Sequence, residues 1–187
     1  MFDKKEHEDY LKQILLALYG DKEIAKDLAF KGGTACYLFY NLSRFSVDLD
    51  FTLLNPSNHA DVYAKIRQII KPLGKIVDQE NKFYTIYFSL SYRQYTTNIK
   101  IEISKHPCKN DSVEIKNYLG TPIQLLTQDV ITAHKFVALT SRRQLVSRDI
   151  FDTWYFLKNH WPVNEKIIQE ETGLTYPKYL RKMLNFL

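Results

Sequence analysis

Two aspartates, Asp48 and Asp50, lie two residues apart in a segment that alternates strictly between apolar and polar side chains. Every odd position from 45 to 53 is apolar and every even position is polar, which predicts a β-strand with one polar face. Both carboxylates then leave the same face, with Cβ atoms about 6–7 Å apart. They repel each other unless a cation lies between them, and Mg²⁺ or Mn²⁺ favours such oxygen ligands. The spacing predicts a divalent-cation site, with an ordinary solvated sheet face as the alternative.

A Gly-Gly-Thr run at residues 32–34 lies about fifteen residues before the aspartates, between a short apolar segment and a predicted helix. Glycine lets the backbone approach a phosphate closely, and a helix N-terminus presents N–H groups to an anion. The run is therefore a candidate phosphate-binding turn, and a simple tight turn is the alternative.

Glu102 offers a third carboxylate, on the polar side of a strand predicted over residues 99–103. If this strand lies beside the strand of Asp48 and Asp50, three acids converge on one rim of the sheet. Three converging acids fit a two-metal site for phosphoryl or nucleotidyl transfer. The alternative is an exposed strand residue beside Lys100.

The elements that must position these residues follow from hydrophobic periodicity and from glycine and proline positions. A mixed α/β front half precedes an all-helical back half, which indicates one α+β domain with a helical appendage. The boundaries are 1–120 for the α/β core and 121–187 for the helical part, with Thr121 and Pro122 as a helix start. The predicted helices cover residues 7–20, 22–27, 34–41, 62–72, 125–141 and 148–160 and a final segment to 187, and the predicted strands cover residues 28–30, 45–53, 85–90 and 99–103.

Composition excludes several classes of protein. The 187 residues carry a formal charge of +5, which permits binding to polyphosphate or nucleic acid without demonstrating it. Cys36 and Cys108 belong to no CxxC pair or Cys/His cluster, and no histidine has metal-ligand spacing, so neither a disulfide framework nor a zinc site is expected. No apolar stretch suits a membrane span or a secretory signal, so we expect a cytoplasmic protein without membrane contact. GxSxG, GxxxxGK[ST] and GxGxxG motifs are absent from the sequence.

Two separated blocks resemble one known family. KGGTA at residues 31–35 followed by RFSVDLDF at 44–51 is similar to the first motif of the AbiEii/AbiGii toxin-like nucleotidyltransferases, with Cys36 where leucine is commoner. AHKFVA at 133–138, then Arg142 or Arg143 and RDIFD at 148–152, resembles the later motif of that family. The resemblance implies the DNA polymerase β-type nucleotidyltransferase fold, with a mixed sheet, flanking helices and a short helical C-terminal part.

The resemblance also implies which residues act. Asp48 and Asp50 would hold Mg²⁺ or Mn²⁺ on the nucleotide phosphates, and Lys135 would place its charge on the triphosphate or the leaving pyrophosphate. Asp149 would orient Lys135, act on the metal shell or position the acceptor, while Asp152 is expected to be structural. The predicted catalytic residues are Asp48, Asp50, Lys135 and Asp149, the predicted nucleotide-binding residues are Gly32, Gly33, Thr34, Arg44, Ser46 and Lys135, and the predicted metal ligands are Asp48, Asp50 and Glu102.

The function that the resemblance implies is transfer of an NMP from an NTP to an acceptor hydroxyl, with release of pyrophosphate. RNA, and tRNA 3′ ends in particular, is the acceptor it suggests, and a toxin neutralised by a co-expressed antitoxin is the biological role. Lys178, Arg181 and Lys182 could contact RNA phosphates. Two alternatives are a protein acceptor and a non-catalytic protein of the same fold that binds nucleotide or RNA.

Overall fold

The computed structural model describes residues 2–93, 97–142 and 144–186 of the chain. This part forms two compact units, and each is described by itself. Unit 1 comprises Met1–Pro107 and Val113–Leu125, and unit 2 comprises Cys108–Ser112 and Leu126–Leu187. Residues 108–112 thus group with the helical unit, and residues 121–125 group with the α/β unit.

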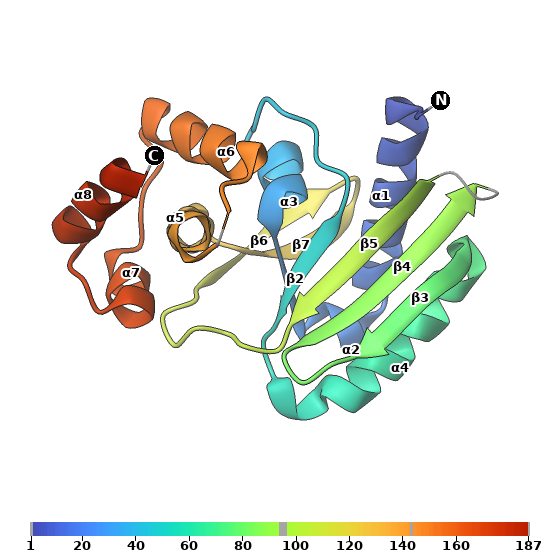
Figure 1. Cartoon of the computed structure of the whole chain (residues 1–187). Coiled ribbons are helices and arrows are strands. Elements are labelled where there is room, and N and C mark those ends of the chain that lie inside the picture. The colour runs from blue at the N-terminus through green and yellow to red at the C-terminus, as the bar shows by residue number, and fades with distance from the viewer. Residues whose placement is uncertain (1, 94–96, 143, 187) are drawn as a thin grey trace. The chain divides into compact units, whose positions relative to one another are not determined.

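Unit 1 is built on a mixed sheet whose seven strands, within the described residues, run in the order β3-β4-β5-β2-β1-β7-β6. Helices α1 and α4 cover one face of β3, β4 and β5 (Figure 1). The strands are β1 (Leu28–Lys31), β2 (Leu49–Leu53), β3 (Lys75–Asn81), β4 (Thr85–Arg93), β5 (Thr97–Ser104), β6 (Val113–Tyr118) and β7 (Thr121–Leu126), and the helices are α1 (Lys4–Gly20), α2 (Lys22–Ala25), α3 (Gly32–Phe39) and α4 (His59–Ile70), with short 3-10 turns at Pro56–Asn58 and Lys71–Leu73.

The core of unit 1 follows from its amphipathic elements. The Asp3 side chain caps α1 by accepting from the N–H groups of Lys5 and Glu6. On α1 the buried stripe at residues 11, 14, 15 and 18 recurs at helical spacing. On β2 the alternate residues Leu49 and Phe51 are fully buried. The α+β prediction is therefore confirmed.

The central strands meet in mixed directions. β2 runs antiparallel to β1 and parallel to β5, and β1 runs parallel to β7. β3, β4 and β5 form an antiparallel meander. The strand of Glu102 lies directly beside the strand of Asp50, and this adjacency is the condition under which the sequence places their carboxylates on one rim of the sheet.

The predicted strand over residues 45–53 is too long, because β2 begins only at Leu49. Its pairing with β1 ends at Lys31↔Asp50, where the chain turns into α3, and its pairing with β5 begins at Leu49↔Ile101. Residues 45–48 thus have no ladder partner among the described residues, although β5 itself begins at Thr97. Asp48 lies in a loop, and Asp50 lies on the strand.

The predicted helix start at Thr121 and Pro122 is also wrong, because these residues begin β7. Proline is tolerated at the first residues of a strand as well as of a helix. Ile123 and Leu125 are fully buried at alternate positions, and this spacing suits a strand. The sequence expectation also omitted β3 and β6, the two edge strands, whose exposed faces leave little apolar pattern to detect.

Unit 2 consists of helices packed around α5 and the loop Cys108–Ser112. Helices α6, α7 and α8 each contact α5. Tyr179 of α8 is fully buried, and its hydroxyl donates to the carbonyl of Phe136 over 2.6 Å. No helix among the described residues is long and apolar enough to cross a membrane. The helices are α5 (Gln128–Ser141), α6 (Ser147–Lys158), α7 (Glu165–Thr172) and α8 (Tyr176–Phe186).

Candidate active site

The Gly-Gly turn of unit 1 connects β1 to α3. Gly32 has φ +79°, a conformation that costs little only for glycine, and it is followed by the buried Gly33. The N-cap residue of α3, Lys31, makes no capping hydrogen bond through its own side chain. A helix N-terminus that follows a glycine turn suits a bound phosphate.

Both glycines lie directly against residues of the second motif. A Cβ atom on Gly32 would collide with the Asp50 carboxylate, lying 2.8 Å from the Cβ of Asp50. A Cβ atom on Gly33 would lie 2.7 Å from Ser46 Oγ and 3.0 Å from Arg44 Nη2. The structure therefore brings the glycine turn, Arg44, Ser46 and Asp50 together, although residues 33 and 46 are distant in sequence.

Asp50 and Glu102 lie side by side on neighbouring strands. They are register partners in the parallel ladder between β2 and β5, so both side chains project from the same face of the sheet. Leu49 and Phe51 project from the opposite face into the core. Asp50 is half-buried and Glu102 is exposed, so an ion bound here can keep water ligands.

Two partly buried hydrogen bonds hold the loop that carries Ser46 and Asp48. The hydroxyl of Thr34 donates to the backbone carbonyl of Asp48. His7 of α1, which is 1% exposed, contacts the carbonyl of Val47 at 2.9 Å through Nε2 and the hydroxyl of Tyr92 at 2.7 Å through Nδ1. Because the Thr34 hydroxyl donates to the Asp48 carbonyl, Thr34 would bind a phosphate through its backbone N–H.

Sequence reasoning did not identify His7 as a residue that supports the loop of Ser46 and Asp48. The sequence contains only an isolated histidine on an amphipathic helix, forty residues before its partner Val47. No spacing in the sequence links the two residues, since the contact depends on how α1 packs against the sheet.

Replacing Gly32 with alanine should destabilise the turn and abolish transfer. The positive φ alone costs a non-glycine residue about 1–3 kcal/mol, and the added Cβ would displace the Asp50 carboxylate. Gly120 is the matched control, because its φ is +87° and nothing lies within 4 Å of an added Cβ. Urea unfolding and a transfer assay on Gly32→Ala and Gly120→Ala would measure the difference. Equal stability and equal activity of the two variants would contradict the assigned role of Gly32.

Unit 2 carries the later motif as a buried charge cluster. Lys135 Nζ lies 2.9 Å from Asp149 Oδ1 and 2.9 Å from Asp152 Oδ2, and both carboxylates are fully buried. Arg142 Nε lies 2.9 Å from Asp149 Oδ2 as an ion pair without hydrogen-bond geometry. The other arginine of the motif, Arg143, lies outside the described residues. The Lys135–Asp149 bond favours the first of the predicted roles for Asp149, which is to orient Lys135, and Asp152 shares that role.

Three solved structures have a similar fold, and two of them are described as nucleotidyltransferase or nucleotidyltransferase-like proteins. JHP933 from Helicobacter pylori has 22% identity, with a match covering 97% of this chain and 77% of its own and a TM-score of 0.56. A putative nucleotidyltransferase from H. pylori has 21% identity, with coverage of 97% and 79% and a TM-score of 0.56. An antigenic nucleotidyltransferase-like protein from Paracoccidioides brasiliensis has 17% identity, with coverage of 81% and 77% and a TM-score of 0.55. The predicted nucleotidyltransferase fold is therefore confirmed.

The family follows from the sequence match. A family model described as the nucleotidyl transferase AbiEii toxin of a type IV toxin–antitoxin system matches residues 13–182. The chain belongs to this AbiEii family of nucleotidyltransferase toxins, as the two motifs had predicted. Comparison with curated proteins gave no match.

Proposed function

We propose that this nucleotidyltransferase is Mg²⁺-dependent and transfers an NMP from an NTP to a hydroxyl of RNA, with tRNA 3′ ends as the leading acceptor. The observation that carries the proposal is the pairing of Asp50 with Glu102 beside Gly32. Acidic oxygen ligands and the N-terminus of α3 thus lie next to each other in unit 1. This combination suits a metal-bound polyphosphate.

The donor set fits a hard divalent cation. Asp48, Asp50 and Glu102 offer only carboxylate oxygens, which Mg²⁺ and Mn²⁺ prefer over nitrogen or sulfur ligands. The missing Cβ of Gly32 leaves the Asp50 carboxylate directly against the backbone turn. A cation held by these residues would neutralise charge on the phosphates and polarise a phosphoryl oxygen.

The other residues of the site would bind and orient the nucleotide. The N–H groups at the start of α3 would bind phosphate oxygens, and Arg44 and Ser46, which lie against Gly33, would add a cation and a hydroxyl. Lys135, held by Asp149 in unit 2, is the residue that the later motif predicts to act on the triphosphate or the leaving pyrophosphate.

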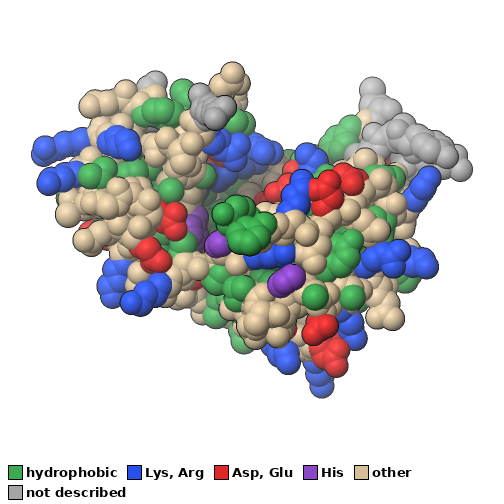
Figure 2. All heavy atoms as spheres, turned by 60° about the horizontal axis from the view of Figure 1, so that its bottom comes forward, with side chains coloured by type: hydrophobic (Ala, Val, Ile, Leu, Met, Phe, Trp, Pro, Cys, Tyr) green, Lys and Arg blue, Asp and Glu red, His purple; other side chains and the backbone are tan. Residues whose placement is uncertain are grey.

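RNA is favoured as the acceptor by the basic side of α8. Lys178, Arg181 and Lys182 are exposed at spacings of three and four residues, while Tyr179 and Met183 face the core. On the face drawn in Figure 2, the described Lys and Arg side chains are otherwise spread over the surface and mixed with Asp and Glu. A short basic stripe could contact a few RNA phosphates.

The acceptor is tested by incubating the protein with each α-labelled NTP, Mg²⁺, total RNA and a protein extract. We expect label on RNA, and less of it with the variant Lys178→Glu/Arg181→Glu/Lys182→Glu. The slope of log K for RNA binding against log salt concentration should fall by about one unit for each phosphate that the variant no longer binds. Lys22→Glu/Lys26→Glu/Lys71→Glu, which alters three exposed lysines of unit 1, is the matched control. Label on protein instead would establish the protein-acceptor alternative, and the absence of label would favour the non-catalytic one.

The biological role we propose is that of the toxin in a toxin–antitoxin pair, with a co-expressed antitoxin as partner. Membership of the family supports this role. The cytoplasmic location stays a prediction.

A further inference from the structure

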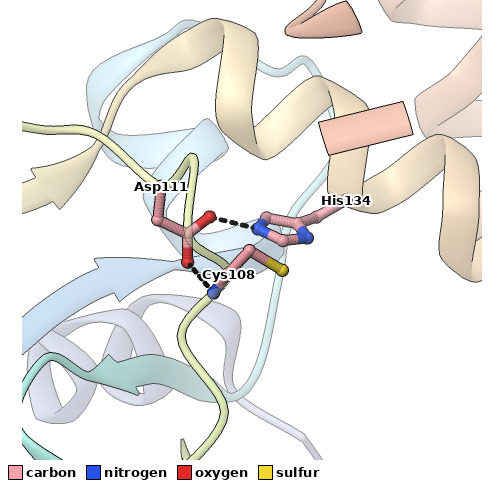
Figure 3. A group of neighbouring side chains, drawn as sticks. All are labelled: Cys108, Asp111 and His134. Carbon is pink, nitrogen blue, oxygen red and sulfur yellow. Dashed lines mark hydrogen bonds and ion pairs between the residues drawn. The ribbon is translucent and has the colours of Figure 1, made fainter. Parts of the chain in front are cut away.

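Three side chains of unit 2 carry metal-ligating atoms that lie close together, and none of them belongs to the charge cluster of Lys135. They are Cys108 and Asp111 from the loop and His134 from α5 (Figure 3). The Cys108 sulfur, an Asp111 carboxylate oxygen and a His134 ring nitrogen all lie within 4.8 Å of one another. Asp111 Oδ1 lies 2.6 Å from His134 Nε2, and the Asp111 side chain is only 4% exposed.

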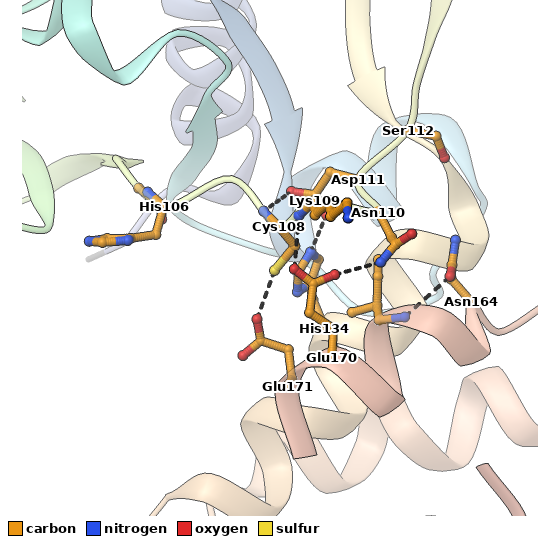
Figure 4. A network of polar contacts seen from close by, with 12 residues as sticks. His106, Cys108, Lys109, Asn110, Asp111, Ser112, His134, Asn164, Glu170 and Glu171 are labelled. Atoms are coloured by element: carbon orange, nitrogen blue, oxygen red, sulfur yellow. Dashed lines mark hydrogen bonds and ion pairs between the residues drawn. The ribbon is translucent and has the colours of Figure 1, made fainter. Parts of the chain in front are cut away.

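The loop is held in a shape that preorganises these ligands. The backbone N–H of Cys108 donates to Asp111 Oδ2 over 2.9 Å, which fixes the carboxylate and directs its other oxygen toward His134 (Figure 3). Glu170 of α7 accepts from the backbone N–H of Lys109 and from the side chain of Asn110 (Figure 4). A fixed second shell is characteristic of metal sites, because it orients the ligands before the ion binds.

Glu171 of α7 lies next to this group. Its Oε1 accepts from the Cys108 sulfur over 2.8 Å (Figure 4). The group itself contains one sulfur, one imidazole nitrogen and one carboxylate. Zinc binds cysteine sulfur at about 2.3 Å and histidine nitrogen or carboxylate oxygen at about 2.0–2.2 Å, so small side-chain movements would bring these three atoms onto one ion.

We propose that Cys108, Asp111 and His134 bind a zinc ion, with Glu171 or water as the fourth ligand. The sulfur and nitrogen donors distinguish this site from that of Asp48, Asp50 and Glu102, which offers oxygen alone and suits Mg²⁺. The ion would tie the loop to α5 and stabilise unit 2. This proposal does not depend on the proposed acceptor or on nucleotide transfer.

A cysteine nucleophile with a His–Asp pair is the competing interpretation of these three residues, and the contact made by the thiol disfavours it. The Cys108 thiol donates to the Glu171 carboxylate, which is not a base that a nucleophile of this kind uses.

The test measures zinc binding by the whole chain in an Asp48→Asn/Asp50→Asn background, so that the acidic site of unit 1 does not contribute. After chelator treatment and incubation with Zn²⁺, we expect one bound ion per chain by elemental analysis. Tm should rise by about 5–10 °C at a zinc concentration 100 times Kd. Co²⁺ in place of Zn²⁺ should give thiolate-to-cobalt absorption, which requires the Cys108 sulfur.

Cys108→Ser and His134→Gln should both fail to bind one zinc ion per chain. Cys108→Ser should also lose the thiolate-to-cobalt absorption. His160→Asn, at an exposed histidine of the same unit, is the matched control and should keep both. If Cys108→Ser fails to fold, His134→Gln decides the matter, with the same expected loss of stoichiometric zinc. The proposal would be overturned if the folded Asp48→Asn/Asp50→Asn chain bound less than one zinc ion per chain. It would also be overturned if Cys108→Ser or His134→Gln bound zinc as well as that chain does. Transfer activity has no part in either result.

Discussion

Replacing Asp50 with asparagine should lower the rate of nucleotidyl transfer by at least about 100-fold, because a ligand worth several kcal/mol to the transition state is lost. The carboxylate lies beside Gly32 and in register with Glu102, so the substitution removes the central acid of the site. The amide has nearly the same shape, and folding should be preserved. Steady-state transfer and urea unfolding would be measured on the same preparation.

Two companion variants make this prediction specific. Glu102→Gln should have a smaller effect than Asp50→Asn, because Glu102 is exposed and lies farther from the glycine turn in the ladder order β5-β2-β1. Asp61→Asn, at an exposed aspartate of α4, should transfer nucleotide at the wild-type rate. An Asp50→Asn enzyme as active as Asp61→Asn would remove Asp50 from the metal site.

Replacing Lys135 with alanine should lower the free energy of unfolding of unit 2 by about 3–5 kcal/mol. Two fully buried carboxylates, Asp149 and Asp152, form ion pairs with this ammonium, and Asp149 also pairs with Arg142. Removing the lysine leaves negative charge in a site without water, which is among the most destabilising of single changes. Denaturant unfolding of Lys135→Ala, with Lys166→Ala at an exposed lysine of α7 as control, would measure the loss.

Loss of activity in Lys135→Ala alone would not separate a catalytic role from a structural one. The variant Lys135→Met/Asp149→Asn/Asp152→Asn removes the buried charges together, so it should recover most of the stability. It should still fail to transfer nucleotide, because the ammonium is absent. Recovery of transfer together with stability would show that the cluster serves folding only.

The part of the site that could be predicted from sequence is the part that local patterns encode. The alternation through Asp50 and through Glu102 predicted two strands with polar faces, and their adjacency makes the two acids register partners. Lys135 and Asp149 were identified by motif, and their helices were found from periodicity. The mutual contact of Lys135, Asp149 and Asp152 follows from the packing of α5 against α6, which no pattern in either helix specifies.

What escaped prediction depends on contacts distant in sequence. The strand expected to begin at residue 45 begins at Leu49, where its pairing with β5 begins and just before its pairing with β1 ends at Lys31↔Asp50. His7 supports the loop of Ser46 from another element altogether. Cys108, Asp111 and His134 looked unrelated, since 23 residues separate Asp111 from His134 and the loop joins the helical unit only through folding.

The central claim is that this chain transfers the α-phosphoryl group of an NTP together with its nucleoside. The most direct measurement compares α-labelled and γ-labelled NTP in parallel reactions with RNA and Mg²⁺, with pyrophosphate release followed in each. We predict that only the α-label becomes covalently attached, that one pyrophosphate is released for each NMP transferred, and that Asp48→Asn/Asp50→Asn does neither. Transfer of the γ-label, or NTP consumption that the double variant retains, would contradict the claim.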